Sequence, residues 1–239
     1  MCAQYASEWK EYGVSTWIKF QANSTPDESV FEPLIPWQHS IRHPFYGKIK
    51  ESTNDYMLVM GWETEKVYND FRSSTDYQKL MANLTTETAP EIQVIVFSNK
   101  MFGIRFTPDT ELITVYWPIL TPPETQDAIW KVEKLVHTSA SGIKNPHHQK
   151  KYPSFGWIEG TRTWNGQQVM ASVWLHGWMS DEAEQNFKST QVRRVWEGSE
   201  ATYPLAVDIF YQDLKSLGAV GWDSAHMGLE RIELFAQAR

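Results

Sequence analysis

The hydrophobic pattern alternates between short apolar runs and amphipathic segments. Short apolar runs bounded by glycine, proline or polar clusters are typical of buried strands. Such runs predict strands at Val14–Phe20, around Tyr46–Lys50, at Tyr56–Met60, Glu91–Phe97 and Leu112–Ile119, around Phe155–Thr161, and at Val169–Leu175 and Leu229–Phe235. Segments with helical spacing lie between them, so each half of the chain has the order β-α-β-β-α-β.

An internal repeat supports this division. GWETEKVYNDFRSS at Gly61–Ser74 recurs as GWMSDEAEQNFKST at Gly177–Thr190, with 116 positions between Trp62 and Trp178. Thr25-Pro-Asp-Glu and Thr121-Pro-Pro-Glu both have the pattern of a capping box, which predicts a helix start in each half. Their smaller offset of 96 indicates an insertion in the second half.

The order β-α-β-β-α-β is that of the ferredoxin-like motif, an antiparallel sheet with both helices on one face. The predicted fold class is α+β, with two tandem ferredoxin-like repeats whose sheets pair into a pseudo-dimeric barrel. The repeats are predicted at 1–108 and 109–239, the second with an inserted loop at 142–152 and an extra helix at 204–217. A monomer would then contain the whole barrel, and the sequence does not decide between a monomer and a homodimer.

Composition narrows the classes of partner. The net charge of −7 disfavours nucleic acid and anionic membranes, and the chain has no apolar run of membrane-spanning length. The single cysteine, Cys2, and the absence of a signal-peptide pattern predict a cytoplasmic protein. Aromatic residues make up 14% of the chain, with 12 tryptophans, so the expected partner is a small apolar or aromatic molecule.

The Gly-Trp motifs carry a resemblance to a known family. A strand that ends in Gly-Trp62 or Gly-Trp178, followed by an acidic helix start and Phe-Arg/Lys-Ser, resembles the dimeric α+β barrel superfamily. The similarity is to its antibiotic-biosynthesis monooxygenase and stress-responsive branches. It implies a pocket between sheet and helices bordered by these tryptophans. Family cyclases often carry a histidine on the following helix, and this chain has none in DYQKLMANL or TQVRRVWEGSE.

The catalytic candidates are residues that can transfer a proton near neutral pH. His176 ends a strand where the first half has Met60, so one half has a polar group that the other lacks. His39 and His43 are further candidates for a general acid or base, and Tyr116 could assist. Each histidine could instead be structural, satisfied by hydrogen bonds in the core or in a loop.

Aromatic residues near these positions are the candidates for a substrate-binding wall. They are Trp62, Trp178, Trp174, Trp37, Trp117, Tyr46 and Tyr56. No metal site is expected, because His39 and His43 have no third ligand at suitable spacing and Pro44 ends any helix between them. No cofactor is expected either, since the chain lacks GxGxxG and P-loop motifs.

Three functions follow from these observations. The first is a cofactor-independent enzyme that cyclises or rearranges an aromatic or polyketide-type metabolite, including by a pericyclic step. The second is a cofactor-free monooxygenase that oxidises a phenol or anthrone with dioxygen. The third is a non-catalytic ligand-binding or stress-response barrel. The two enzymes would use the same residues, so the sequence does not separate them.

Overall fold

The computed structural model describes residues 13–97, 109–132, 154–191 and 200–235. The strands are β1 (Val14–Gln21), β2 (Ile41–Lys48), β3 (Asp55–Trp62), β4 (Glu91–Phe97), β5 (Asp109–Pro118), β6 (Ser154–Trp164), β7 (Gln167–Trp178), β8 (Gly221–Met227) and β9 (Glu230–Arg231). The helices are η1 (Glu28–Trp37), α2 (Glu65–Arg72), α3 (Thr75–Leu84), α4 (Pro123–Lys131), α5 (Asp181–Lys188), α6 (Ala206–Ser216) and η4 (Glu233–Phe235). Among the described helices, none combines the length and the apolar character needed to cross a membrane.

The nine strands of the described residues form one antiparallel sheet in the order β8-β5-β7-β6-β4-β1-β3-β2-β9. The first half, residues 13–97, supplies β4-β1-β3-β2, and the second half, residues 109–235, supplies β8-β5-β7-β6. In both groups the strands that come fourth, first, third and second along the chain lie side by side. The groups are joined by β4 and β6, where Ile95 pairs with Ile158.

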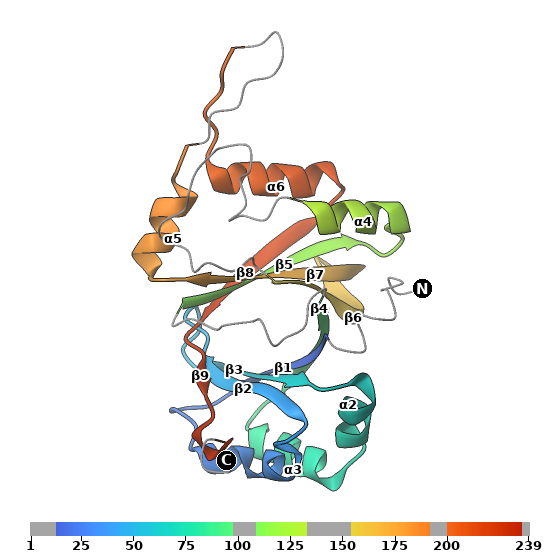
Figure 1. Ribbon diagram of the computed structural model, residues 1–239, viewed down its shortest axis with the longest axis vertical. Coiled ribbons are helices and arrows are strands. Elements are labelled where there is room, and N and C mark those ends of the chain that lie inside the picture. The colour runs from blue at the N-terminus through green and yellow to red at the C-terminus, as the bar shows by residue number, and fades with distance from the viewer. Residues whose placement is uncertain (1–12, 98–108, 133–153, 192–199, 236–239) are drawn as a thin grey trace.

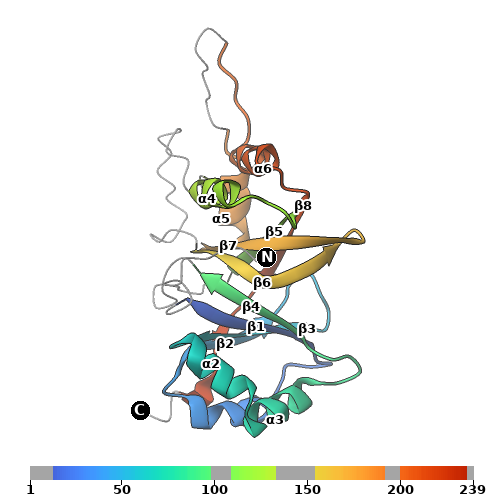
Figure 2. The ribbon, with the colours of Figure 1, turned by 90° about the vertical axis from the view of Figure 1, so that its right-hand side faces the viewer.

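The sheet curls so that its helices lie on the outside (Figures 1 and 2). Helices α4, α5 and α6 cover β5, β7 and β8, whereas η1, α2 and α3 cover β1, β2 and β3. The curl also brings together the two ends of the sheet, because β9 pairs with β2 and Ile49 forms a bridge with Met227. Gly47 permits this approach, since a Cβ atom there would lie 2.1 Å from the carbonyl oxygen of Gly228.

Three apolar cores follow from this arrangement. One lies under η1, α2 and α3 and includes Phe31, Trp62 and Phe71. A second lies under α4, α5 and α6 and includes Trp174 and Phe210. The third fills the inside of the curl with side chains from both halves, among them Trp17, Val59, Leu112 and Val173. Strand alternation accounts for this division, because successive side chains point to opposite faces.

Local signals explain most element boundaries. The hydroxyls of Thr64 and Ser180 accept hydrogen bonds from backbone amides in the first turns of α2 and α5, so both copies of the Gly-Trp repeat begin a helix in the same way. Asn165 and Gly166 form the hairpin turn between β6 and β7. Both residues have positive φ, at 47° and 78°, as a tight two-residue turn requires.

Neither predicted capping box forms. The cap of η1 is Asp27, whose carboxylate accepts from the amide of Ser29 at 2.8 Å, rather than Thr25. Pro33 and Pro36 lie inside this helix and lack the amide protons that an α-helix would use, which favours the 3₁₀ form. In the second half, the hydroxyl of Thr121 donates to the carbonyl of Pro118 instead of capping α4.

The predicted final strand at 229–235 is wrong. The fourth strand of the second half is β8, which begins three residues after Gly218, the positive-φ residue that follows the C-cap of α6. The sequence of β8 has no apolar pattern, because Asp223 and Ser224 are exposed and His226 pairs with charged groups. The apolar residues after it form only β9 and η4, and Ile232 is buried in the core of the first half. The insertion predicted at 142–152 lies outside the described residues.

Candidate functional site

Three ionisable side chains form a row across the second half of the sheet. In the strand register, Glu111 of β5 lies opposite His176 of β7 on one side and His226 of β8 on the other. Directly paired residues of antiparallel strands point to the same face. That face is covered by helices, since the ring of His176 packs edge-on against Phe210 of α6. Glu111 and His176 are fully buried.

Glu111 is held by two donors from the second Gly-Trp repeat. The indole Nε1 of Trp178 donates to Oε2 at 2.9 Å, and the ammonium of Lys188 lies 2.7 Å from Oε1. A buried carboxylate is costly unless it is paired and hydrogen-bonded. Lys188 supplies the opposite charge, and Trp178 completes the hydrogen bonding of this buried side chain.

Glu184 adds a second carboxylate from α5. It forms an ion pair with Lys188, one helical turn later, and its Oε1 lies 2.9 Å from Nε2 of His226. Burial alone would raise the pKa of Glu184, but the hydrogen bonds from His226 and Lys188 outweigh it and lower that pKa. Glu111 and Glu184 therefore share the cations between them.

His226 is a cation at neutral pH. Its hydrogen bond to Glu184 raises its pKa to about 9, with burial opposing and a hydrogen bond to Glu51 adding to the rise. Nδ1 lies 2.5 Å from Oε1 of Glu51, so each ring nitrogen donates to a carboxylate. In this state His226 is a proton donor and a positive charge rather than a base.

Aromatic side chains surround the row. His176 stacks on Trp178 with ring centroids 5.9 Å apart. Tyr211 of α6 stacks on Trp222 at 4.5 Å, and burial, followed by the charge of Glu111, raises its pKa to about 12, so it stays a neutral phenol. The buried aromatic residues of this core are Trp117, Phe155, Trp157, Trp174, Trp178, Phe187 and Phe210.

The same row in the first half has no ionisable group. Its members are Thr16 of β1, flanked by Met60 of β3 and Val94 of β4. Trp62 donates to the hydroxyl of Thr16 at 2.8 Å, in the place where Trp178 donates to Glu111. The two halves thus share a scaffold contact and differ in the chemistry attached to it.

The α-helical partners differ in the same way. In the Gly-Trp repeat, Tyr68 occupies the position of Glu184, and Arg72 that of Lys188. Tyr68 is buried and Arg72 is exposed. An acid–base cluster is therefore assembled in the second half, where the first half has an aromatic core.

Comparison with known proteins identifies the fold. No family model and no curated protein sequence matches the chain. Solved structures do match: an anthrone oxidase-like protein gives a TM-score of 0.54 at 10% identity, covering 93% of both chains. A proposed monooxygenase from Lactobacillus acidophilus gives 0.52 at 10% identity, covering 91% of this chain and 94% of the other. A proposed chlorite dismutase gives 0.52 at 6% identity, covering 95% and 100%.

The chain shares the fold of these solved structures. Identities of 6 to 10% establish a shared fold, and the chemistry of this barrel has to be argued from its own residues.

The barrel brings together part of the predicted site. His176, Trp174, Trp178 and Trp117 lie in one core under the helices of the second half. Tyr116 lies on the opposite face of β5, where its hydroxyl donates to Asp223 at 2.9 Å. The structure therefore does not place Tyr116 beside His176.

The other predicted residues lie in the first half of the barrel. His39 is exposed in the turn between η1 and β2, and the side chain of His43 lies outside the described residues. The remaining aromatic candidates all pack in the first-half core: Trp37, Tyr46, Tyr56 and Trp62. Trp37 donates to Asp76 at 3.1 Å.

Sequence reasoning missed the charged members of the cluster. Glu184 and Lys188 are within the repeat itself, and the change from Tyr68 to Glu184 was a usable signal. Glu111 could have been found as an acidic residue inside an apolar strand. His226 could not, because its strand was not predicted.

One group of ligand atoms could hold a metal ion. Among the described residues, Glu111, Glu184 and His226 offer one ligand atom each, all within 4.8 Å of one another. The ammonium of Lys188 already contacts both carboxylates, and His226 would have to lose a proton to bind. The contacts present are those of an ion-pair network.

The two Gly-Trp tryptophans offer a matched test of the buried carboxylate. Replacing Trp178 with phenylalanine leaves Glu111 without one donor and should lower the free energy of unfolding by about 2–3 kcal/mol, as hydrogen bonds to buried charges do. Trp62→Phe, which leaves only the hydroxyl of Thr16, should cost about 1 kcal/mol less. Urea unfolding of both variants measures the difference; equal losses would mean that the carboxylate adds nothing.

Proposed function

We propose that this chain is a cofactor-independent acid–base enzyme that cyclises or rearranges a small aromatic or polyketide-type molecule. The observation that carries the proposal is the row His226–Glu111–His176, which is ionisable in the second half and apolar or neutral in the first. The first half shows that the same scaffold packs with uncharged residues in this row, namely Thr16, Met60 and Val94. The buried charges of the second half therefore point to chemistry rather than to packing.

The proposed roles follow from charge and burial. His226, as a cation, would donate a proton or hydrogen bond to a carbonyl or phenol oxygen, and the neutral phenol of Tyr211 would assist. His176 would accept the proton that the substrate loses. A positioned acid or base contributes roughly 10²–10⁴-fold in rate. Lys188 would pair with both Glu111 and Glu184 beneath these groups.

Aromatic walls would supply orientation. Trp174 and Trp178 lie on the face of β7 that carries His176, so they are the proposed surfaces against which a flat substrate folds. Holding reacting atoms in a near-attack geometry can supply roughly 7–11 kcal/mol of a barrier. Cyclisation, including a pericyclic step, needs mainly this contribution.

A second candidate is cofactor-free oxygenation of a phenol or anthrone. It is favoured by the similar structures, which are named as anthrone oxidase-like and as proposed monooxygenases. The same proton acceptor would make a phenolate, which would then react with dioxygen.

The repeated strand order supports a further proposal about the architecture. The orders β4-β1-β3-β2 and β8-β5-β7-β6 are alike, and Trp62 and Trp178 make equivalent contacts. We infer two tandem ferredoxin-like repeats, of which the second holds the site.

Incubation with an extract of the producing organism tests the function. The protein is added to the extract under air and under argon, and new products are detected by mass spectrometry. A product formed equally in both supports cyclisation or rearrangement; a product formed only in air supports oxygenation. Wild-type protein that releases a bound ligand unchanged in both would instead indicate a binding protein.

Variants connect the product to the row. His176→Met installs the residue that the first half has at this position and should reduce product formation at least 100-fold. His39→Asn, at an exposed histidine of the other half, is the control and should leave the rate unchanged. Equal rates for the two variants would exclude His176 from the reaction.

A further inference from the structure

The loop between β2 and β3, residues 49–54, belongs to the first half but contacts the second. Ile49 forms a bridge with Met227, and the amide of Lys50 donates to the carbonyl of His226 at 2.8 Å. These backbone contacts hold the loop against the end of β8. Residues on the loop are thereby placed beside the acid–base row.

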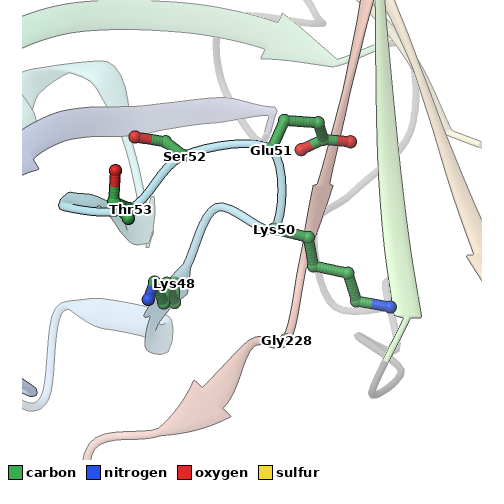
Figure 3. A pocket seen from close by; sticks show the side chains of 6 residues that line it. All are labelled: Lys48, Lys50, Glu51, Ser52, Thr53 and Gly228. Carbon is green, nitrogen blue, oxygen red and sulfur yellow. The ribbon is translucent and has the colours of Figure 1, made fainter.

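Two side chains of the loop are directed toward the second half. Figure 3 shows Lys50 and Glu51 directed toward β5 and β8. The ammonium of Lys50 lies 2.9 Å from Asp109 and 2.5 Å from Asp181, both in the second half. Beside the loop is an open hollow of about 590 Å³, which is lined by Lys48, Lys50, Glu51, Ser52, Thr53 and Gly228.

Glu51 accepts hydrogen bonds from both the backbone and the ring of His226. Each carboxylate oxygen lies 3.0 Å from the backbone amide nitrogen of His226, and Oε1 also lies 2.5 Å from Nδ1. The other ring nitrogen, Nε2, then lies 2.9 Å from Glu184. A single side chain from the first half therefore holds the ring in the plane that directs Nε2 toward the second-half row.

We propose that Glu51 is a positioning residue that completes the acid–base site of the second half from the first. The proposal rests on the proposed function of the row. Glu51 accepts from Nδ1, which leaves the Nε2 proton of His226 as the one that faces Glu184 and the interior. The second half alone would then carry the row but lack Glu51, the group that orients its proton donor His226.

The charges around His226 come from three elements besides its own strand. Glu51 lies on the β2–β3 loop, Glu184 and Lys188 on α5, and Glu111 on β5, with its Oε1 3.9 Å from Nε2. These three carboxylates, together with Asp181 of α5, favour the imidazolium, and Lys188 opposes it. Removing Glu51 removes the one carboxylate that contacts Nδ1, while the contact of Nε2 with Glu184 remains.

The test is an NMR titration of His226 in the full chain, compared with turnover. Glu51→Gln keeps the size of the side chain and removes its charge; Glu87→Gln makes the same change at an exposed residue of the α3–β4 loop. We expect Glu51→Gln to lower the pKa of His226 by about one unit, a tenfold weaker hold on the proton, and Glu87→Gln to leave it in place. The titration needs no substrate, so it stands even if the proposed function fails.

Turnover supplies the second readout. On the product identified with the wild-type protein, Glu51→Gln should lower kcat about tenfold and shift the upper limb of the pH profile together with the pKa of His226. An unchanged pKa overturns the proposal, and so does a shifted pKa with an unchanged pH profile. If Glu51→Gln does not fold, Glu51→Asp, which draws the carboxylate back by one methylene, is titrated with the same expected direction.

Discussion

Replacing Lys188 with methionine is expected to lower the free energy of unfolding by about 3–5 kcal/mol, which is the usual cost of leaving a buried charge without its partner. Lys188 contacts both Glu111 and Glu184, and Glu111 is fully buried. The variant would keep the volume of the side chain and lose its charge. Urea unfolding at pH 7 measures the effect.

The first half supplies the control for this prediction. Arg72 occupies the equivalent helix position but is exposed, so Arg72→Met should cost less than about 1 kcal/mol. The double variant Glu111→Thr/Lys188→Met removes one buried carboxylate along with the cation and copies the Trp62–Thr16 contact. It should recover a large part of the loss, because a pair removed together leaves fewer unpaired charges. A single variant as stable as the wild type would contradict the ion-pair account.

Stability should also fall as the pH rises from about 6.5 to above 9. His226 has its pKa raised from 6.5 to about 9, so the folded state binds the proton more tightly than the unfolded state. Its contribution is fully present below pH 6.5 and is lost as the pH passes 9. A rise of this size corresponds to about 3–4 kcal/mol. Unfolding free energies measured across this range give the slope directly.

Two variants, and the unfolding free energy at low pH, check whether the decline comes from His226. His226→Gln should flatten the decline between pH 6.5 and 9, while His39→Gln, at an exposed histidine, should keep it. Glu184 and Glu51 have lowered pKa values, so their contribution is present above about 4.5 and is lost as the pH falls through their folded pKa. Maximum stability is therefore expected between about pH 5 and 6.5. A decline that survives His226→Gln would assign it to another group.

The architecture was largely accessible from the sequence, because it is encoded in local patterns. Strand alternation and the repeated Gly-Trp motif predicted seven of the strands and the helices that follow Thr64 and Ser180. The facing of Trp174 and His176 on one side of β7, and of Tyr116 and Trp117 on opposite sides of β5, follows from the same alternation. The capping boxes failed because both helices begin later than predicted, with Asp27 and Pro122 at the cap positions in place of Thr25 and Thr121.

The site was less accessible, because its members meet only through strand register. His176 was identified by comparison with Met60, because each lies directly before one copy of the repeat. Glu111 and His226 become its neighbours through the order β8-β5-β7, which no local pattern specifies. Glu51 is further removed, since it reaches His226 only because the ends of the sheet meet.

The return of the chain to its first half has a consequence for how the protein folds. Residues 230 and 231 pair with β2, and the buried Ile232 fills the core under η1, although nearly two hundred positions separate these segments along the chain. The amides of Glu233 and Leu234 donate to Glu28. The first half therefore has no finished core of its own until those late residues arrive. Contacts of such long sequence separation slow folding, and they make the two halves unfold together rather than as separable parts.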